Sequence, residues 1–439
     1  MIRALRNRNF RLYLIGQAIS QTGNWFQQTA EIWLILQLTG SGTAVGVYTA
    51  VRFGPLLLFG VHAGLLTDRY DHLKLLMVTQ SVYIVSVGAL AISAFSASPS
   101  LALLYGTVLV RGITLAIDNP LRRSVVRDLV PDAELTNAIS INSTMHTVAR
   151  FIGPALAGLV LVTLGAAWCF ALNATSYVAV IVSLLLMDRR LLRFVPRVEA
   201  GPGQVIEGFR YAWRNRRIRR TLIMVTVLGV FVLNTWDVIL PVYAQKTFAG
   251  DARLYGFLVS LMGFGAFAGG VAGMRLTVIR GSFFRWANAL LAVSFAIVAF
   301  APVLPAAFVG LGMLGAGATA FQIAAQSRLQ LEAEDVMSGR ILALYSVALV
   351  GVRPVGGMIS GWLVDFADPR AAFLVPGVVC AVVALSLLLT RPAPARRAEV
   401  PEVLAATATA GDRADTEAAA SAIVRGEATR AGGTTRRGM

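Results

Sequence analysis

Long apolar segments separated by short polar ones run along almost the whole chain. Twelve of these segments hold the roughly 20 apolar residues that a helix needs to cross a bilayer. None alternates apolar and polar residues with the period of two expected of a barrel strand. Because a helix pairs its backbone groups within one segment, the pattern predicts an all-α polytopic membrane protein with twelve transmembrane helices. The segments lie at about 10–37, 43–66, 74–96, 100–121, 137–163, 167–187, 220–244, 254–276, 283–302, 305–327, 339–365 and 371–390.

Composition and charge agree with this pattern and add a topology. Of 439 residues, 56% are hydrophobic and only 14% are charged, whereas soluble proteins average about 25% charged residues. With the N-terminus in the cytoplasm, 32 of the 39 lysines and arginines fall on the cytoplasmic side and three fall outside. This bias predicts a multi-pass protein of the plasma (inner) membrane with both termini in the cytoplasm. The net charge of +16 is then a topology signal, and no nucleic-acid partner is expected.

The two halves of the chain resemble each other, which predicts a parallel duplication. Each half has six predicted spans and begins on the cytoplasmic side, the arrangement in which two six-helix bundles face each other around a site at mid-membrane. The matches fall at two shifts. At a shift of 203, Arg150, Gly153 and Gly158 match Arg353, Gly356 and Gly361, and at a shift of 210, Asn24, Gly46 and Gly60 match Asn234, Gly256 and Gly270.

The domain organisation follows from these spans. We expect an N-terminal bundle at 1–190, a cytoplasmic linker with an amphipathic segment at 191–219, and a C-terminal bundle at 220–391. The arginine-rich linker segment is suited to an anionic membrane surface. Residues 392–439 are rich in Ala, Thr, Gly, Arg and Glu, a composition that predicts a disordered cytoplasmic tail.

Enzyme chemistry has no support in the sequence. Cys169 and Cys380 lie in apolar runs and provide neither a disulfide framework nor metal-ligand spacing. Neither of the two lysines, Lys74 and Lys246, follows a glycine, so a GxxxxGK[ST] phosphate loop is absent. The three histidines are not paired with a thiol or serine motif. We therefore expect no enzyme, no cofactor and no metal.

One polar stretch, GLLTDRYDHLKLL at 64–76, concentrates charge between two apolar spans. It resembles the motif of the loop between helices 2 and 3 in the major facilitator superfamily, GxxxDRxGRR or close to it. The stretches NRNFRLYLIGQAISQTGNW and NPLRRSVVRDLVPDAELTNA resemble the exporter branch called transmembrane secretion effectors, which includes enterobactin exporters. The resemblance covers about residues 1–390. A solvated turn is the alternative for the charged stretch.

The resemblance implies a conformational latch at this loop. Asp68 would bind the free N–H groups at the N-terminal end of helix 11 in the outward-facing state. Gly64 would allow close packing, and Arg69 would stay near phosphates or neighbouring helix ends. Where the family has an arginine, this chain has His72, which implies a weaker, pH-dependent bridge to an acid on helix 4. Asp118 is the candidate partner.

The resemblance extends to the fifth span. RFIGPALAG, with Arg150, Gly153, Pro154 and Gly158, resembles part of the antiporter motif, in which the GP pair and a following small pair bend the helix. Arg150 has an alternative place at the contact with helix 8. His146 lies four residues before Arg150 and therefore on the same helix face. For both residues a structural role is the favoured reading.

Ionisable residues inside a span are costly and mark cavities or partners. Glu31 and Arg52 lie at similar depth in the first two spans, where they can form an ion pair or take part in transport. Arg111 lies near mid-membrane in the fourth span. Asp237 is the mid-span acid of the second half. Glu31, Arg52, Arg111 and Asp237 are therefore the candidates for proton coupling or for the cavity, with Asp118 as a further acid.

These observations predict a major facilitator fold and a secondary transporter. The resemblance implies export of small molecules, either a drug-like compound or a metabolite such as a siderophore, by proton antiport and alternating access. Its expected partners are the substrate, protons and the lipid bilayer, and a monomer is the expected state. A proton-coupled uptake symporter and a non-transporting membrane receptor or scaffold are the alternatives.

Overall fold

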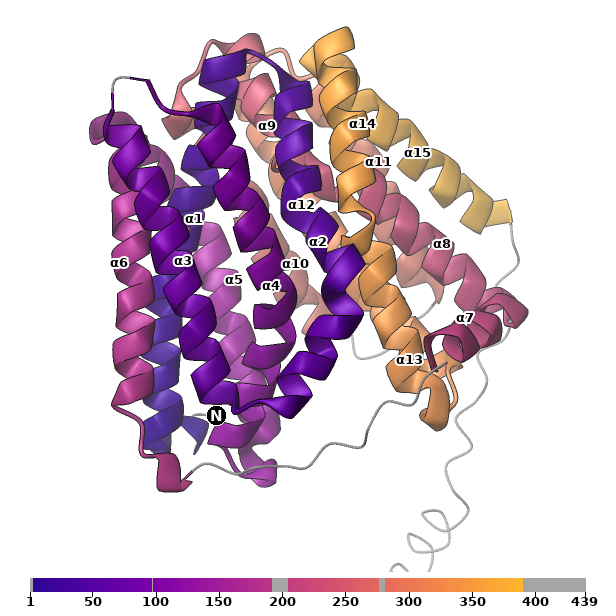
Figure 1. Ribbon diagram of the computed structural model, residues 1–439. Helices are drawn as coiled ribbons and strands as arrows, with labels where there is room; N and C mark the ends of the chain where they lie inside the picture. The colour runs from indigo at the N-terminus through magenta and orange to yellow at the C-terminus, as the bar shows by residue number, and fades with distance from the viewer. Residues whose placement is uncertain (1–2, 97, 192–203, 276–280, 390–439) are drawn as a thin grey trace, which may run out of the picture. The chain divides into compact units, whose positions relative to one another are not determined.

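The computed structural model describes residues 3–96, 98–191, 204–275 and 281–389, and places Met1–Thr390 in one compact unit. Within these residues the elements are helices that run side by side (Figure 1). After the short turn η1 (Arg3–Arg6), the first half consists of α1 (Arg8–Thr39), α2 (Gly42–Arg69), α3 (His72–Phe95), α4 (Leu101–Leu129), α5 (Asp132–Thr163) and α6 (Ala166–Leu185), followed by η2 (Arg189–Leu191).

The second half begins with a short amphipathic helix, and two of its spans are interrupted. The seventh span combines α8, η3, α9 and the π-helical turn η4, and the eleventh joins α13 to α14 through the π-helical turn η5. The elements are α7 (Gln204–Arg214), α8 (Arg216–Phe231), η3 (Leu233–Thr235), α9 (Ile239–Val242), η4 (Tyr243–Thr247), α10 (Ala252–Arg275), α11 (Gly281–Ala299), α12 (Leu304–Glu332), α13 (Asp335–Ser346), η5 (Val347–Gly351), α14 (Arg353–Phe366) and α15 (Pro369–Leu389).

The predicted twelve spans fit this arrangement. In the described part of the chain, ten helical stretches are long and apolar enough to cross a membrane, and Phe283–Ala299 is a shorter apolar helix. The remaining predicted span, 10–37, corresponds to α1, which is 32 residues long but carries many buried polar side chains. Many polar residues of α1 face the interior of the bundle and not the lipid. The mean hydropathy of α1 is therefore low for a helix that can cross a membrane.

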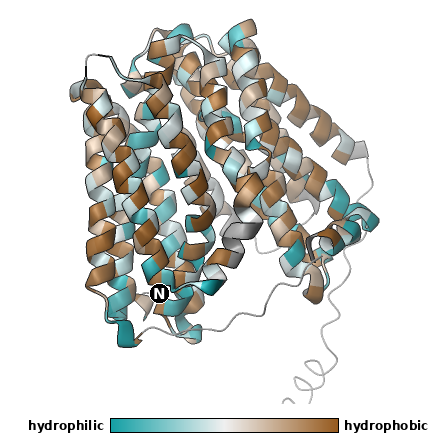
Figure 2. Cartoon of the chain, viewed as in Figure 1, coloured by the Kyte–Doolittle hydropathy of each residue, from teal (hydrophilic) through white to brown (hydrophobic). Residues whose placement is uncertain are grey.

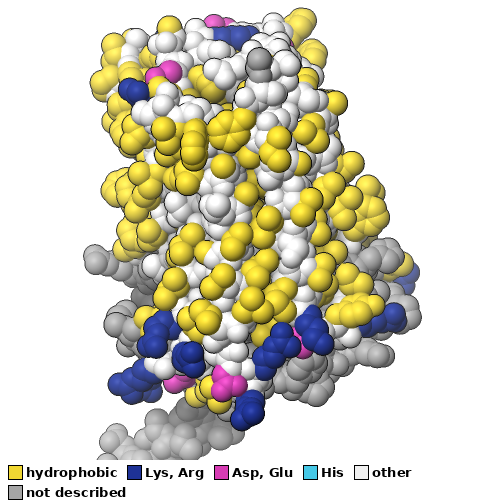
Figure 3. Space-filling view, turned by 60° about the vertical axis from the view of Figure 1, so that its left-hand side comes forward, with side chains coloured by type: hydrophobic (Ala, Val, Ile, Leu, Met, Phe, Trp, Pro, Cys, Tyr) yellow, Lys and Arg dark blue, Asp and Glu magenta, His cyan; other side chains and the backbone are white. Residues whose placement is uncertain are grey.

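Side-chain polarity follows the geometry of a membrane-embedded bundle. The outward faces of the helices are mostly apolar along their length, and hydrophilic residues concentrate toward the helix ends (Figure 2). In the face shown by Figure 3, most lysine and arginine side chains gather at one end, and hydrophobic side chains cover the middle. We call the end that carries the N-terminus the N-terminal face, and the other end the far face.

Helix boundaries follow local sequence signals. Asn7 caps the start of α1, and its side chain accepts hydrogen bonds from Asn9 N and Phe10 N; Ser41 caps the start of α2, and its hydroxyl accepts from Ala44 N. Such caps satisfy N–H groups that have no partner within the helix. Gly40 ends α1 with φ of 64°, a left-handed conformation that glycine adopts without strain.

One contact between the halves joins α5 to α10 through small residues. A methyl group added to Gly158 would lie 2.5 Å from the carbonyl oxygen of Ala252, and one added to Gly256 would collide with the carbonyl oxygen of Pro154. Only glycine allows the two backbones to approach this closely.

The second contact joins α2 to α14 in the same way. A methyl group on Gly46 would lie 2.5 Å from the carbonyl oxygen of Gly357, and one on Gly361 would lie 2.5 Å from that of Gly42. Gly46 and Gly256 are matched by the sequence repeat, and so are Gly158 and Gly361. The matched glycines thus occupy equivalent interfaces, as a duplicated bundle requires.

Candidate transport cavity

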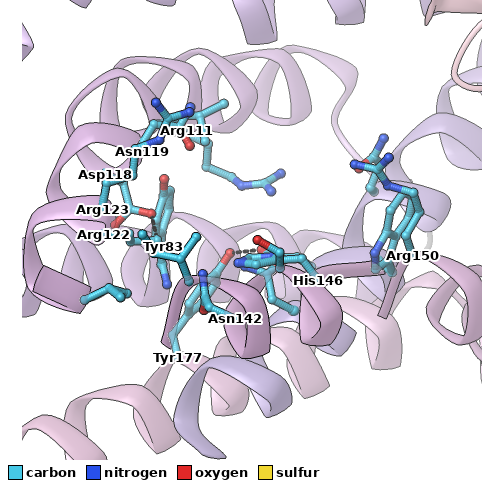
Figure 4. Close-up of a pocket in the computed structure, with 18 of the residues that line it drawn as sticks. Tyr83, Arg111, Asp118, Asn119, Arg122, Arg123, Asn142, His146, Arg150 and Tyr177 are labelled. Carbon is cyan, nitrogen blue, oxygen red and sulfur yellow. Dashed lines mark hydrogen bonds and ion pairs between the residues drawn. The ribbon is translucent and has the colours of Figure 1, made fainter. Parts of the chain in front are cut away.

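A cavity of about 790 Å³ opens among the helices of the first half (Figure 4). This volume lies within the range of about 300–1,000 Å³ typical of small-molecule sites. Its walls extend from the middle of α2 and α4 to the ends of α4 and α5 near the N-terminal face. The lining residues are Gln21, Asn24, Trp25, Gln28, Arg52, Tyr83, Arg111, Leu115, Asp118, Asn119, Arg122, Arg123, Val126, Arg127, Leu135, Ile139, Asn142, Ser143, His146, Arg150 and Tyr177.

Glu31 lies behind the deep wall of the cavity, completely buried. Its carboxylate accepts hydrogen bonds from Gln27 Nε2 at 2.6 Å, from Tyr48 Oη at 3.0 Å and from an Arg111 guanidinium nitrogen at 2.6 Å. Arg52 donates to Tyr48 Oη at 2.8 Å and so reaches Glu31 through the tyrosine. Of the two alternatives for Glu31 and Arg52, a direct ion pair is not formed, because Arg111 of α4 occupies the position beside the carboxylate.

Asp118 lies closer to the N-terminal face and forms a second polar cluster. It is bonded to Arg122, one turn along the same helix, and accepts from Thr79 Oγ1 at 3.0 Å and Gln80 Nε2 at 3.2 Å. Arg122 in turn donates to Gln17 of α1. The cluster therefore ties α1, α3 and α4 together along one wall of the cavity.

Asp237 joins the two halves of the protein from within the seventh span. It is buried, accepts from Gln28 Nε2 of α1 at 2.7 Å and forms an ion pair with Arg353 of α14. The Arg353 guanidinium also lies 4.1 Å from the centre of the Phe53 ring of α2, a cation–π contact across the same seam. Changing the charge of Asp237 would act directly on contacts between the halves.

Asp365 closes the far face. This residue at the end of α14 accepts hydrogen bonds from Ser41 Oγ at 2.6 Å, Gly42 N at 2.6 Å and Thr43 N at 2.8 Å. The carboxylate thus caps the N-terminus of α2, a helix of the other half, where free N–H groups favour a negative charge. Sequence reasoning missed this contact, since an acid near a helix end gives no sign of which other helix it will meet.

The expected bridge between His72 and Asp118 is wrong. His72 is the first residue of α3, and its Nδ1 contacts Asp128 at the adjacent end of α4. Asp118 lies ten residues farther into the helix, about 15 Å away along its axis. Arg69 is exposed, whereas the surroundings of Gly64 and the side chain of Asp68 lie outside what the structure describes.

The residues of the fifth-span motif lie along the cavity and the seam between the halves. Arg150 lines the cavity, and its guanidinium lies 5.7 Å from the centre of the Trp236 ring. Gly153 packs against the Trp25 side chain, and Pro154 and Gly158 lie at the contact with α10. His146 and Arg150 lie across the cavity from the arginines of α4 (Figure 4). Both were expected to be structural, yet both face the cavity.

Comparison with known proteins agrees with this architecture. The sequence profile described as "transmembrane secretion effector" matches residues 2–418. The staphyloferrin A transporter of Staphylococcus aureus is 28% identical over 253 residues, which cover 55% of this chain and 61% of that protein. The multidrug efflux pump Tap of Mycolicibacterium fortuitum is 24% identical, covering 86% of this chain and 95% of the pump. The macrolide efflux protein A of Streptococcus pyogenes is 24% identical, with the same two coverages.

Solved structures share the fold at low sequence identity. A mutant of the nucleoside transporter NupG superposes with a TM-score of 0.72 at 12% identity, covering 87% of this chain and 99% of that one. A bacterial homologue of the iron transporter ferroportin, in an inward-facing state, gives a TM-score of 0.67 at 15% identity, with the same coverages. The cavity, the two bundles and the profile match together place this chain in the transmembrane secretion effector family of major facilitator superfamily transporters.

Proposed function

We propose that this protein exports small molecules from the cytoplasm across the plasma membrane, by alternating access coupled to proton antiport. Two relatives are named as an efflux pump and an efflux protein, which supports export, and a third is named as a staphyloferrin A transporter, which supports transport of a small molecule. The cavity provides a site of suitable size, and the substrate, protons and the bilayer are its partners. The cavity is lined by helices of a single chain, which supports a monomer as the working unit.

The arrangement corresponds to an inward-facing state in this proposal. The gathering of basic side chains at the N-terminal face supports a cytoplasmic position for that end and for both termini (Figure 3). The cavity reaches toward this face, while Asp365 and the paired glycines hold the far face together. In the opposite state, we propose that Asp68 with Gly64 and Arg69 latches the cytoplasmic ends, while His72 and Asp128 hold α3 against α4.

The observation that carries proton coupling is the position of Asp237 between Gln28 and Arg353. A proton on this carboxylate would remove its charge and weaken both contacts, one of which crosses from the first half to the second. A proton taken up from outside in the outward-facing state would thus be released to the cytoplasm as the contacts with Gln28 and Arg353 form again in the inward-facing state. Glu31 has no direct contact of this kind across the seam among its described partners, so Asp237 is the preferred proton carrier.

The test uses purified protein in liposomes that contain a pH-sensitive dye. Under an imposed pH gradient, a macrolide and staphyloferrin A would each be added, and movement of compound and protons would be recorded together. We expect substrate-triggered proton movement that Asp237→Asn lowers at least about tenfold, which corresponds to a rise of about 1.4 kcal/mol in the activation free energy. Asp368→Asn is the matched control, since Asp368 is exposed and caps α15 within its own half.

The alternatives predict different results. Inward movement of compound together with protons would support an uptake symporter. Compound movement without protons would exclude antiport and leave a uniporter or another coupling ion. A receptor or scaffold would move none of the compounds, and its signalling would survive neutralisation of Asp237.

A further inference from the structure

We propose that the cavity binds an organic anion with more than one acidic group. This inference deepens the proposed function and rests on it, because it names the substrate class of the same cavity. The relatives do not point to one charge class by their names, so the inference depends on the charges that line this cavity.

Positive charge exceeds negative charge in the cavity wall. Six arginines and one aspartate line it. Arg111 is paired with Glu31 and Arg122 with Asp118. The other four arginines have no carboxylate partner among the described residues, and they are Arg52, Arg123, Arg127 and Arg150.

Topology accounts for only part of this excess. Arg123 and Arg127 lie near the end of α4 at the N-terminal face, where the positive-inside bias places arginines. Arg52 is ten residues from the far end of α2, and Arg150 is 13 residues from the far end of α5. At 1.5 Å per residue, both lie roughly 15–20 Å inside the helices. A cation at that depth is costly without a partner, and an anionic ligand would provide one.

The internal repeat shows that Arg150 lacks, among the described residues, the carboxylate partner of the matching arginine in the second half. Its match in the second half is Arg353, which is paired with Asp237. At the shift that matches Asn24 with Asn234, the position equivalent to Asp237 is Gln27, a neutral residue. One half therefore holds its mid-membrane arginine with a carboxylate of the protein, and the other half leaves the equivalent arginine available to a ligand.

The deep wall also offers unused donors. Arg111 is buried, and its Nε–H donates to no acceptor in the described chain, although its terminal nitrogen bonds Glu31. The indole of Trp25 lies on the same wall, as does the amide of Gln28, which already donates one hydrogen bond to Asp237. Donors at the deep end and the arginines of α4 near the mouth would bind acidic groups at two levels, which favours a ligand with more than one such group.

The first test measures the electrostatic potential inside the cavity and does not require transport. Ser143→Cys places a thiol in the cavity wall, and Ser98→Cys places one at an exposed site at the far face. In detergent, each would react with anionic and cationic methanethiosulfonates of similar size. Relative to the control thiol, we expect the cavity thiol to favour the anionic reagent by roughly tenfold or more, and high salt to reduce this preference. An equal or cationic preference overturns the proposal.

The second test compares transport of an anion and a cation that share the same xanthene scaffold. Proteoliposomes under a pH gradient would be given the xanthene anion carboxyfluorescein or the xanthene cation rhodamine 6G. We expect faster transport of the anion, lowered about tenfold by Arg52→Gln or Arg150→Gln, and unchanged by the control Arg210→Gln, an exposed arginine of α7 outside the cavity.

The outcomes separate this proposal from the proposed function. Equal or faster transport of the cation overturns the anionic substrate and leaves the transporter in place. An anionic preference of the cavity thiol with no movement of either dye, macrolide or staphyloferrin A supports the anion site and overturns export.

Discussion

The contact between Asp365 and the start of α2 makes the closure of the far face testable. The carboxylate binds Ser41 Oγ and the backbone N–H groups of Gly42 and Thr43, all on the other half of the protein. In an outward-facing state these groups would separate. Asp365→Asn should therefore weaken the state seen here and shift the population toward opening of the far face.

The magnitude follows from the bonds that change. Replacing an N-cap acceptor costs about 0.5–2 kcal/mol, and a negative charge at a helix N-terminus contributes about 0.3–1 kcal/mol. Asparagine keeps one acceptor oxygen but loses the charge, and Asp365 is exposed, so the lower part of the combined range applies. A loss of about 1.4 kcal/mol would change the ratio of the two states about tenfold.

Distance measurements between spin labels would detect this shift. Labels at Ser98→Cys and Lys246→Cys would report the separation of the two halves at the far face, since both residues are exposed. The native Cys169 and Cys380 are buried and can stay in place. We expect the long-distance population to rise about tenfold relative to the short one in Asp365→Asn.

Asp368→Asn is the control for this experiment. Asp368 is an exposed acid at the same face, and it accepts a hydrogen bond at 2.7 Å from Arg370 N within its own half. It should leave the distance distribution unchanged. If both variants shift the distribution equally, the effect comes from surface charge in general, and if neither does, the contact made by Asp365 does not control closure.

Two further predictions concern the seam and the buried ion pair. Gly256→Leu should favour separation of α5 from α10 at the far face, because its side chain would collide with the backbone of α5. The reactivity of a cysteine introduced at the far face, as in Ser98→Cys, would then rise. Unchanged reactivity would contradict the close packing. Arg111→Met leaves the Glu31 carboxylate buried without its cation and should destabilise the protein by about 3–5 kcal/mol, seen as a lower Tm. Adding Glu31→Gln should restore much of that loss, and a double variant as unstable as the single one would contradict the pairing.

The fold could be predicted from the sequence because its main signal is local. Each span is a run of apolar residues, and lipid requires every such run to satisfy its own backbone hydrogen bonds. The repeat added the arrangement of the halves, and its matched glycines, such as Gly46 and Gly256, do occupy equivalent interfaces. The span at α1 was also predicted, although its inward face is polar.

The candidate site was only partly predictable. Glu31, Arg52, Arg111, Asp118 and Asp237 drew attention because charges inside spans are costly. Their partners could not be predicted, since a residue on one helix can contact any of several neighbouring helices. The sequence suggested Arg52 as a partner for Glu31, because the two lie at similar depth. The packing of α4 against α1 and α2 instead places Arg111 beside the Glu31 carboxylate.

The sequence by itself determined the membrane location, the helical class, the duplicated halves and the depth at which charges are buried. These properties depend on transfer of each segment from water to lipid, which acts residue by residue. Only the tertiary structure decided which charges neutralise each other and which remain open to a cavity. Arg111 and Arg353 are paired, whereas Arg52 and Arg150 have no carboxylate partner among the described residues. The reason is that electrostatic pairing depends on distances of a few ångströms between helices, which are set by how glycines and aromatic rings let those helices pack.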